Sequence, residues 1–165
     1  MPIEVSRPND REVRVVRQFN APRHLVWDAH TKPELMQKWC IGYPGWTLPV
    51  CEMDVREGGK YRWRWRSDED GSEFGFFGTF SEVKAPSRLA HDQYYDPGDM
   101  DYAMPVGDPC LVALDLSEAD GVTTLVCTMT FVSKEVCESA VATGMTDGME
   151  VGYVRIDELF KAEAV

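Results

Sequence analysis

Basic side chains are scarce in this sequence, and long apolar runs are missing from it. Its 165 residues include 17 lysines and arginines against 28 acidic residues, for a formal net charge of −11. A field of that sign repels phosphate backbones and anionic lipid surfaces, so we expect no nucleic-acid and no membrane partner. No apolar run approaches the ~20 residues of a spanning helix, and residues 1–10 do not resemble a signal peptide. These absences predict a cytoplasmic protein.

Histidine is also rare, and neither histidine nor cysteine is spaced for a metal. His24 and His30 are the closest of three histidines, and a separation of six residues does not place both on one helix face. The five cysteines form no CxxC pair, which predicts reduced and mostly buried thiols. Nucleophile-elbow, zinc-protease, dinucleotide and phosphate-loop motifs are missing as well. The sequence therefore predicts no metal, no cofactor and no recognisable catalytic residues.

What the chain does contain suits one domain, because 44% of its residues are hydrophobic. Residues 1–10 carry two prolines and no periodicity, which predicts a flexible N-terminus before a domain at 11–165. Glu12 to Phe19 alternates as a half-buried strand does. Two short helices should follow, the second starting at a capping box formed by Thr31 and Glu34.

Strands and one long helix should make up the rest of the domain. The predicted strands cover residues 50–55, 60–66, 72–83, 88–95, 109–117 and 122–131. Short spacers between them favour antiparallel neighbours, and only the segment 96–108 approaches the length of a crossover. Residues 133–163 lack proline and repeat apolar side chains at roughly helical spacing, which predicts a helix of ~30 residues. The order is that of an α+β fold.

The most regular strand is 60–66, in which aromatic and basic side chains alternate. Its two faces carry Tyr61, Trp63 and Trp65 on one side and Arg62, Arg64 and Arg66 on the other. A hairpin with the preceding strand would set acids opposite the arginines. The arginine row is either an anion site or a solvated face neutralised by those acids, and we favour the second. The aromatic row is either a pocket wall or ordinary core, and the pattern leaves both open.

The predicted last helix has little bulk along one side. Ala140, Gly144, Gly148 and Gly152 fall four residues apart, with Met145 and Met149 beside them. Each helical glycine costs about 1 kcal/mol relative to alanine, so the strip must serve close packing, a bend or a ligand. Acidic residues interrupt the segment and exclude a membrane dimerisation face.

Several motifs together resemble a known family over roughly residues 12–162. They are Phe19-Asn-Ala-Pro22 before Val26-Trp27, Thr31-Lys-Pro-Glu-Leu35 with Trp39, Met53-Asp-Val-Arg-Glu-Gly-Gly59, Phe76-Phe-Gly78 with Phe80, and Thr143-Gly-Met-Thr-Asp-Gly148. The sequence is similar to the AHSA1-like (activator of Hsp90 ATPase homologue 1-like) family of the START-like, or SRPBCC, helix-grip superfamily. The resemblance implies a curved antiparallel sheet of six to seven strands around a long C-terminal helix, with two short helices after the first strand.

The resemblance also implies a cavity between sheet and helix that receives apolar molecules in the superfamily. The chain departs from the family at Met149, where many relatives have tryptophan, and in an enlarged segment 96–108. We therefore expect an apolar or aromatic small-molecule ligand. The candidate wall residues are Trp63, Tyr94, Met145, Met149 and Tyr153.

Two other functional classes stay open beside the small-molecule prediction. The first is an Hsp90 co-chaperone-like or other protein-interaction or stress-response domain, in which case the chain has a protein partner. The second is a polyketide-cyclase-like or hydrolytic enzyme that uses an inward Asp92, Asp115 or His91 as acid or base. A homodimer is also left open, and the pattern does not say which strand parity faces inward.

Overall fold

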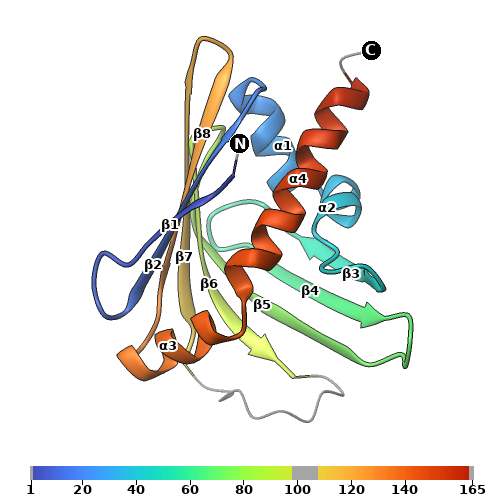
Figure 1. The fold of residues 1–165 in the computed structure, drawn as a ribbon, viewed down its shortest axis with the longest axis vertical. Coiled ribbons are helices and arrows are strands. Elements are labelled where there is room, and N and C mark those ends of the chain that lie inside the picture. The colour runs from blue at the N-terminus through green and yellow to red at the C-terminus, as the bar shows by residue number, and fades with distance from the viewer. Residues whose placement is uncertain (1, 98–107, 164–165) are drawn as a thin grey trace.

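The computed structural model describes residues 2–97 and 108–163, which form one eight-stranded antiparallel sheet and four helices (Figure 1). The strands are β1 (Glu4–Ser6), β2 (Glu12–Phe19), β3 (Trp46–Met53), β4 (Lys60–Ser67), β5 (Glu73–Lys84), β6 (Arg88–Asp96), β7 (Cys110–Ala119) and β8 (Val122–Thr130). The helices are α1 (Arg23–Thr31), α2 (Pro33–Trp39), α3 (Lys134–Ala142) and α4 (Met145–Glu163). The α+β helix-grip architecture predicted from the sequence is confirmed.

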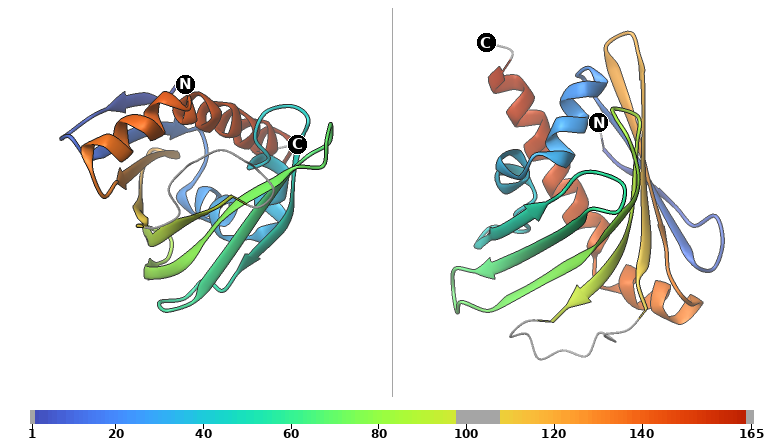
Figure 2. Two further views of the ribbon diagram at one scale, coloured as in Figure 1. Left: turned by 90° about the horizontal axis from the view of Figure 1, so that it is seen from below. Right: turned by 180° about the vertical axis from the view of Figure 1, so that it is seen from behind.

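The sheet has the order β1-β2-β8-β7-β6-β5-β4-β3 and curves into a trough (Figure 2). Seen from below in Figure 2, α3 and α4 lie across the open side of this trough. The sheet has one strand more than the predicted six to seven, because Glu4–Ser6 pairs with β2. That short strand lies within residues 1–10, where the lack of periodicity gave no sign of it.

Strand β2 shows how the sequence builds the packed part of the interior. Val13, Val15 and Phe19 are fully buried, as their alternation predicts. Arg17 shares their parity and is also buried, with 2% of its surface exposed. Its guanidinium binds both carboxylate oxygens of Asp157 in α4, at 2.9 and 2.8 Å. This buried ion pair ties the last helix to β2.

The predicted single helix at 133–163 is wrong, because the chain forms α3 and α4 with a break between them. Ser133 does begin the first helix, since its side-chain oxygen accepts a hydrogen bond from the amide of Val136. Gly144 stands at the break with a φ of +79°, a conformation that favours glycine. Close packing, a bend and a ligand were the three possible uses of the small-residue strip. At Gly144 the structure shows the bend.

Two boundaries also differ from the prediction. Strand β3 begins at Trp46, inside the stretch of glycine and proline that predicted a loop, and a bulge between Thr47 and Val50 accommodates Pro49. Thr31 does not cap α2, because its hydroxyl donates to the carbonyl of Trp27 one turn earlier. The predicted enlarged segment 96–108 lies mostly outside the described residues.

Candidate functional site

The inner face of β4, β5 and β6 carries the aromatic row that the sequence singled out. Inward residues are Tyr61, Trp63, Trp65 and Ser67 on β4, Phe74, Phe76, Gly78, Phe80 and Val83 on β5, and Leu89, His91, Gln93 and Tyr95 on β6. Trp63, Phe76 and Tyr95 lie side by side across the three strands. Strand pairing thus brings together residues that are far apart in the sequence.

Aromatic contacts join this row into a continuous surface. Trp65 stacks on Phe74 with ring centroids 5.4 Å apart, and Phe76 meets Tyr95 edge-on at 5.7 Å. Trp63, Phe74, Phe76 and Tyr95 are each only half-buried, and we call these four residues the inner aromatic face. The inward position of these large side chains, together with their remaining exposure, makes this the candidate site.

A second group of inward residues, next to the inner aromatic face, is buried. Tyr61, Phe80 and His91 are buried and lie in mutual ring contact, between 4.8 and 5.9 Å. The Tyr61 hydroxyl donates to the backbone carbonyl of Asp92, and burial raises the pKa of that phenol. Burial lowers the pKa of His91, so this imidazole is neutral near pH 7.

The acidic residues considered for catalysis are engaged in structure. The Asp92 carboxylate accepts the backbone amide of Thr79 at 2.7 Å, beside the β5 bulge. Both carboxylate oxygens of Asp115 accept from Arg88, at 2.8 and 2.9 Å. Each hydrogen bond occupies a group that an acid–base mechanism would need.

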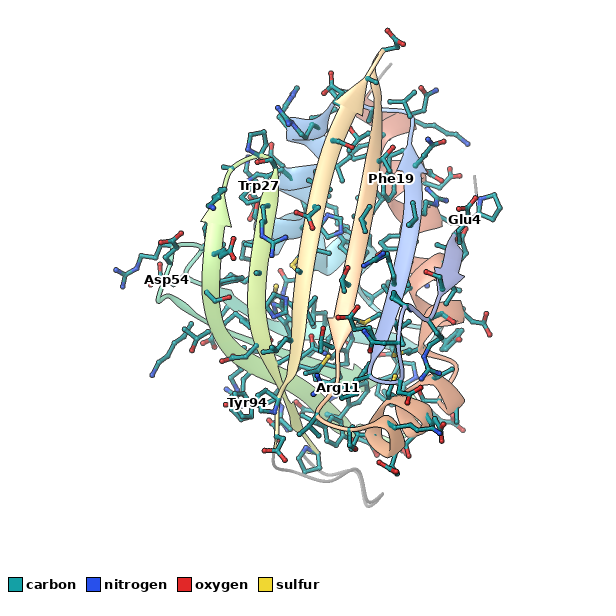
Figure 3. The ribbon with its side chains drawn as sticks, turned by 90° about the vertical axis from the view of Figure 1, so that its left-hand side faces the viewer. Glu4, Arg11, Phe19, Trp27, Asp54 and Tyr94 are labelled. Carbon is teal, nitrogen blue, oxygen red and sulfur yellow. The ribbon has the colours of Figure 1, made fainter. Side chains whose placement is uncertain are left out.

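The five predicted wall residues do not all meet at one place. Tyr94 points to the outer face, where it stacks on Phe77 with centroids 5.4 Å apart, and Figure 3 views this face with Tyr94 labelled. The adjacent Tyr95 takes the inward position instead. Tyr153 is buried against Phe19 in the packed region, with 3% of its surface exposed.

The other three predicted wall residues are Trp63 on β4 and Met145 and Met149 on α4. Trp63 is in the inner aromatic face itself. Met145 and Met149 are half-buried one helical turn apart on α4, and both pack against the main core. The strip beside them is used for packing, because a Cβ at Gly152 would lie 3.2 Å from the Trp39 ring.

The arginine row on the opposite face of β4 is at least partly neutralised, as the second interpretation proposed. Arg64 binds Glu73 and Asp96, each at 3.0 Å. Arg62 lies directly opposite Glu52, in the register that the hairpin predicted. These pairs favour a solvated, charge-balanced face over an anion site.

Phe74, Phe76 and Tyr95 belong to the site but were not among the wall residues predicted from the sequence. The signal was present for the two phenylalanines, which alternate inside a predicted strand and stand in register with Trp65 and Trp63. Tyr95 was hidden because two tyrosines are consecutive, and nothing in the pattern showed which of them points inward. Pairing with β5 decides this, since Tyr95 stands opposite Phe76.

A separate cleft of about 230 Å³ lies between α1, α2 and the end of α4. Leu25, Leu35, Leu159 and Phe160 line it with Asp28 and Lys32. Asp28 and Lys32, which are four residues apart, form an ion pair at 3.5 Å. This cleft does not include the predicted wall residues.

The cysteines are all free, two buried and three half-buried, which agrees with reduced thiols.

The geometry of sheet and terminal helix agrees with a comparison against protein families. The model of activator of Hsp90 ATPase homolog 1-like proteins matches residues 20–161. The chain belongs to this family. Its helix-grip fold is that of the START-like superfamily, as the sequence motifs indicated. Comparison with proteins of curated function gave no match.

Solved structures share the fold of this AHSA1-like chain. A Rhodobacter sphaeroides protein is 26% identical with a TM-score of 0.88, and the match covers 98% of this chain and 99% of that one. A Nitrosomonas europaea protein is 24% identical with a TM-score of 0.80, covering 96% and 99%. A Mycobacterium smegmatis protein is 21% identical with a TM-score of 0.81, covering 96% of each chain.

Metal and membrane signals are lacking in the part of the chain that the structure describes. Within residues 2–97 and 108–163, no three histidine, cysteine or acidic side chains are grouped to hold a metal ion. None of the helices there is both long and apolar enough to cross a membrane.

Proposed function

We propose that the chain binds a small apolar or aromatic molecule between the inner aromatic face and α4. The observation that carries this proposal is the half-burial of Trp63, Phe74, Phe76 and Tyr95 on the inward side of the sheet. Fully burying a large apolar side chain is worth about 1.5–3 kcal/mol, and part of that free energy is not realised here. A ligand that covers these rings would recover it. Family membership supports the proposal, because a cavity at this place is expected of the START-like fold.

Thermal unfolding with a panel of neutral two- and three-ring aromatic compounds tests the proposal. A compound at about 100 times its dissociation constant should stabilise the chain by about 2.7 kcal/mol, with a logarithmic dependence on concentration. Absence of stabilisation across the panel would contradict the proposal.

A space-filling variant locates the binding. Met149→Trp should weaken the same compounds by occupying their volume, because Met149 is half-buried beside the trough. Val154→Trp on the same helix is the control, since Val154 is 44% exposed and should tolerate the larger ring. Equal affinities in the two variants would remove Met149 from the site.

A protein-interaction role is the second candidate, and the outer face of the same strands favours it. Phe77 is 42% exposed and stacks on Tyr94, and Leu111 on β7 is 55% exposed. Contiguous exposed apolar surface is typical of protein contacts, and these three side chains lie on one face of the adjacent strands β5, β6 and β7. If this face binds an Hsp90, Phe77→Ser should weaken the complex in calorimetric titration, whereas Phe76→Ser on the inner face should not. No binding by the unmodified chain would count against the Hsp90 version of this role.

A further inference from the structure

We infer that the ligand is a neutral molecule whose hydrogen-bond acceptor receives the indole N–H of Trp63. The inference rests on the proposed small-molecule function and adds the chemical class of the ligand. Two independent observations lead to it, one concerning charge and the other concerning an unpaired donor.

The inner side of the three strands carries no formal charge. None of the inward residues of β4, β5 and β6 is acidic or basic except His91, whose lowered pKa leaves it neutral. The two arginines on the elements packed nearby are held by other partners. Arg17 is neutralised by Asp157, whereas Arg155 keeps its charge but donates to the carbonyls of Trp39 and Gly42, at the end of α2 and just after it. A charged ligand on these strands would lose its hydration without gaining a counter-ion from them, which is strongly unfavourable.

The indole of Trp63 differs from the two buried indoles, those of Trp39 and Trp65. Trp39 Nε1 donates to the carbonyl of Ala29 and Trp65 Nε1 donates to the carbonyl of Cys40, each at 2.7 Å. Trp63 Nε1 is shielded from solvent, yet none of the described residues accepts its proton. Buried donors are paired in the great majority of cases, and leaving one unpaired is unfavourable.

The position of Trp63 makes a ligand the natural source of that acceptor. Its ring is half-buried between Phe76 and Cys51 on the neighbouring strands. It packs against the main core and also against the smaller buried group of Tyr61, Phe80 and Leu89. An aromatic molecule packed on Phe76 and Tyr95 would therefore lie next to this indole, and its acceptor would reach Nε1 by displacing the atoms that cover this nitrogen in the structure. A carbonyl, ether or ring nitrogen on such a molecule supplies the acceptor without adding charge.

Three compounds of nearly equal shape test the inference on the full chain. They are 2-acetylnaphthalene, which is neutral with an acceptor, 2-ethylnaphthalene, which lacks the acceptor, and 2-naphthoate, which is charged. We expect the ketone to bind about tenfold more tightly than the hydrocarbon, as one hydrogen bond to a buried donor allows. Naphthoate should bind most weakly. The same trio built on biphenyl checks that the order does not depend on one ring system.

Two tryptophan variants decide whether Trp63 is the donor. Trp63→Phe keeps an aromatic ring but removes the N–H, so the ketone and the hydrocarbon should then bind equally. Trp65→Phe is the matched control two residues away on the same face, and it should keep the tenfold preference. Circular dichroism and thermal unfolding establish that both variants fold.

The outcomes separate this inference from the function on which it rests. If none of the compounds binds, both fail. If ketone and hydrocarbon bind equally to the unmodified chain, or if naphthoate binds most tightly, the site exists but the inference is wrong. A preference for the ketone that survives in Trp63→Phe also overturns the assignment of the donor.

Discussion

Two regions of one curved sheet use the same kinds of residue with different results. Over β2, the rings of Phe19, of Trp39 in α2 and of Tyr153 in α4 are buried, and Tyr153 contacts the other two. Over β4 and β5, Trp63 and Phe76 face the same interior but remain half-buried. The difference lies in what covers each region, because α4 is fastened to β2 by the Arg17–Asp157 pair. Residue type alone therefore does not decide which aromatic row is core and which is a site.

The largest expected effect comes from deleting one ring in each region. Phe19→Ala should lower the free energy of unfolding by about 3–5 kcal/mol, because Phe19 is fully buried and contacts Tyr153 and Phe160. Phe76→Ala should cost clearly less, since its ring is already partly exposed. Urea unfolding of both variants measures the difference. Equal losses would show that the inner aromatic face is ordinary core.

Acid should act on the packed region through a buried histidine. Burial lowers the pKa of His30 to about 4, although a hydrogen bond with the Val26 carbonyl opposes the shift. The unfolded chain, with a histidine pKa of about 6.5, therefore binds more protons between these values, and stability falls as the pH falls. From about pH 7 to about pH 5 this residue should remove about 2 kcal/mol.

Unfolding in urea across this pH range measures that loss. His30→Gln should flatten the pH dependence, whereas His24→Gln, which changes an exposed histidine on the same helix, should leave it unchanged. An unaltered slope in His30→Gln would refute the assignment. His91, whose pKa burial also lowers, should add a loss of the same sign in the other region.

The smallest effect concerns the two glycines inside α4. Gly148→Ala should stabilise the chain by about 0.5–1 kcal/mol, because the new Cβ meets nothing closer than the Tyr43 hydroxyl at 3.8 Å. Gly152→Ala should gain nothing or lose stability, since its Cβ would lie 3.2 Å from a Trp39 ring that is buried and hydrogen-bonded. Thermal unfolding compares them. A larger gain for Gly152→Ala would mean that the helix is not held by close packing there.

The sequence predicted most of the fold because the fold depends on local patterns. Alternation located β2, and the aromatic–arginine alternation gave both faces of β4. The break at Gly144 was missed because apolar spacing on its two sides suits one helix as well as two. β1 was missed because a three-residue edge strand leaves too short a pattern to detect.

The candidate site was predicted less completely, for a reason that concerns long-range pairing. Trp63 was found because its own strand alternates, whereas Tyr94 and Tyr95 could be told apart only by the register of β6 on β5. Tyr153 lies on the last helix as expected, but the way that helix packs on β2 places its ring against Phe19. Neither the register across strands nor the packing of a helix on a distant strand can be predicted from local periodicity.

The most direct test follows the tryptophan indole N–H signals by nitrogen-15 NMR while 2-acetylnaphthalene is added. The Trp63 signal should move strongly downfield, while the signals of Trp39 and Trp65, which already have backbone acceptors, should move little. A titration that leaves the Trp63 signal in place while another indole shifts would contradict the proposal that the inner aromatic face is a binding site.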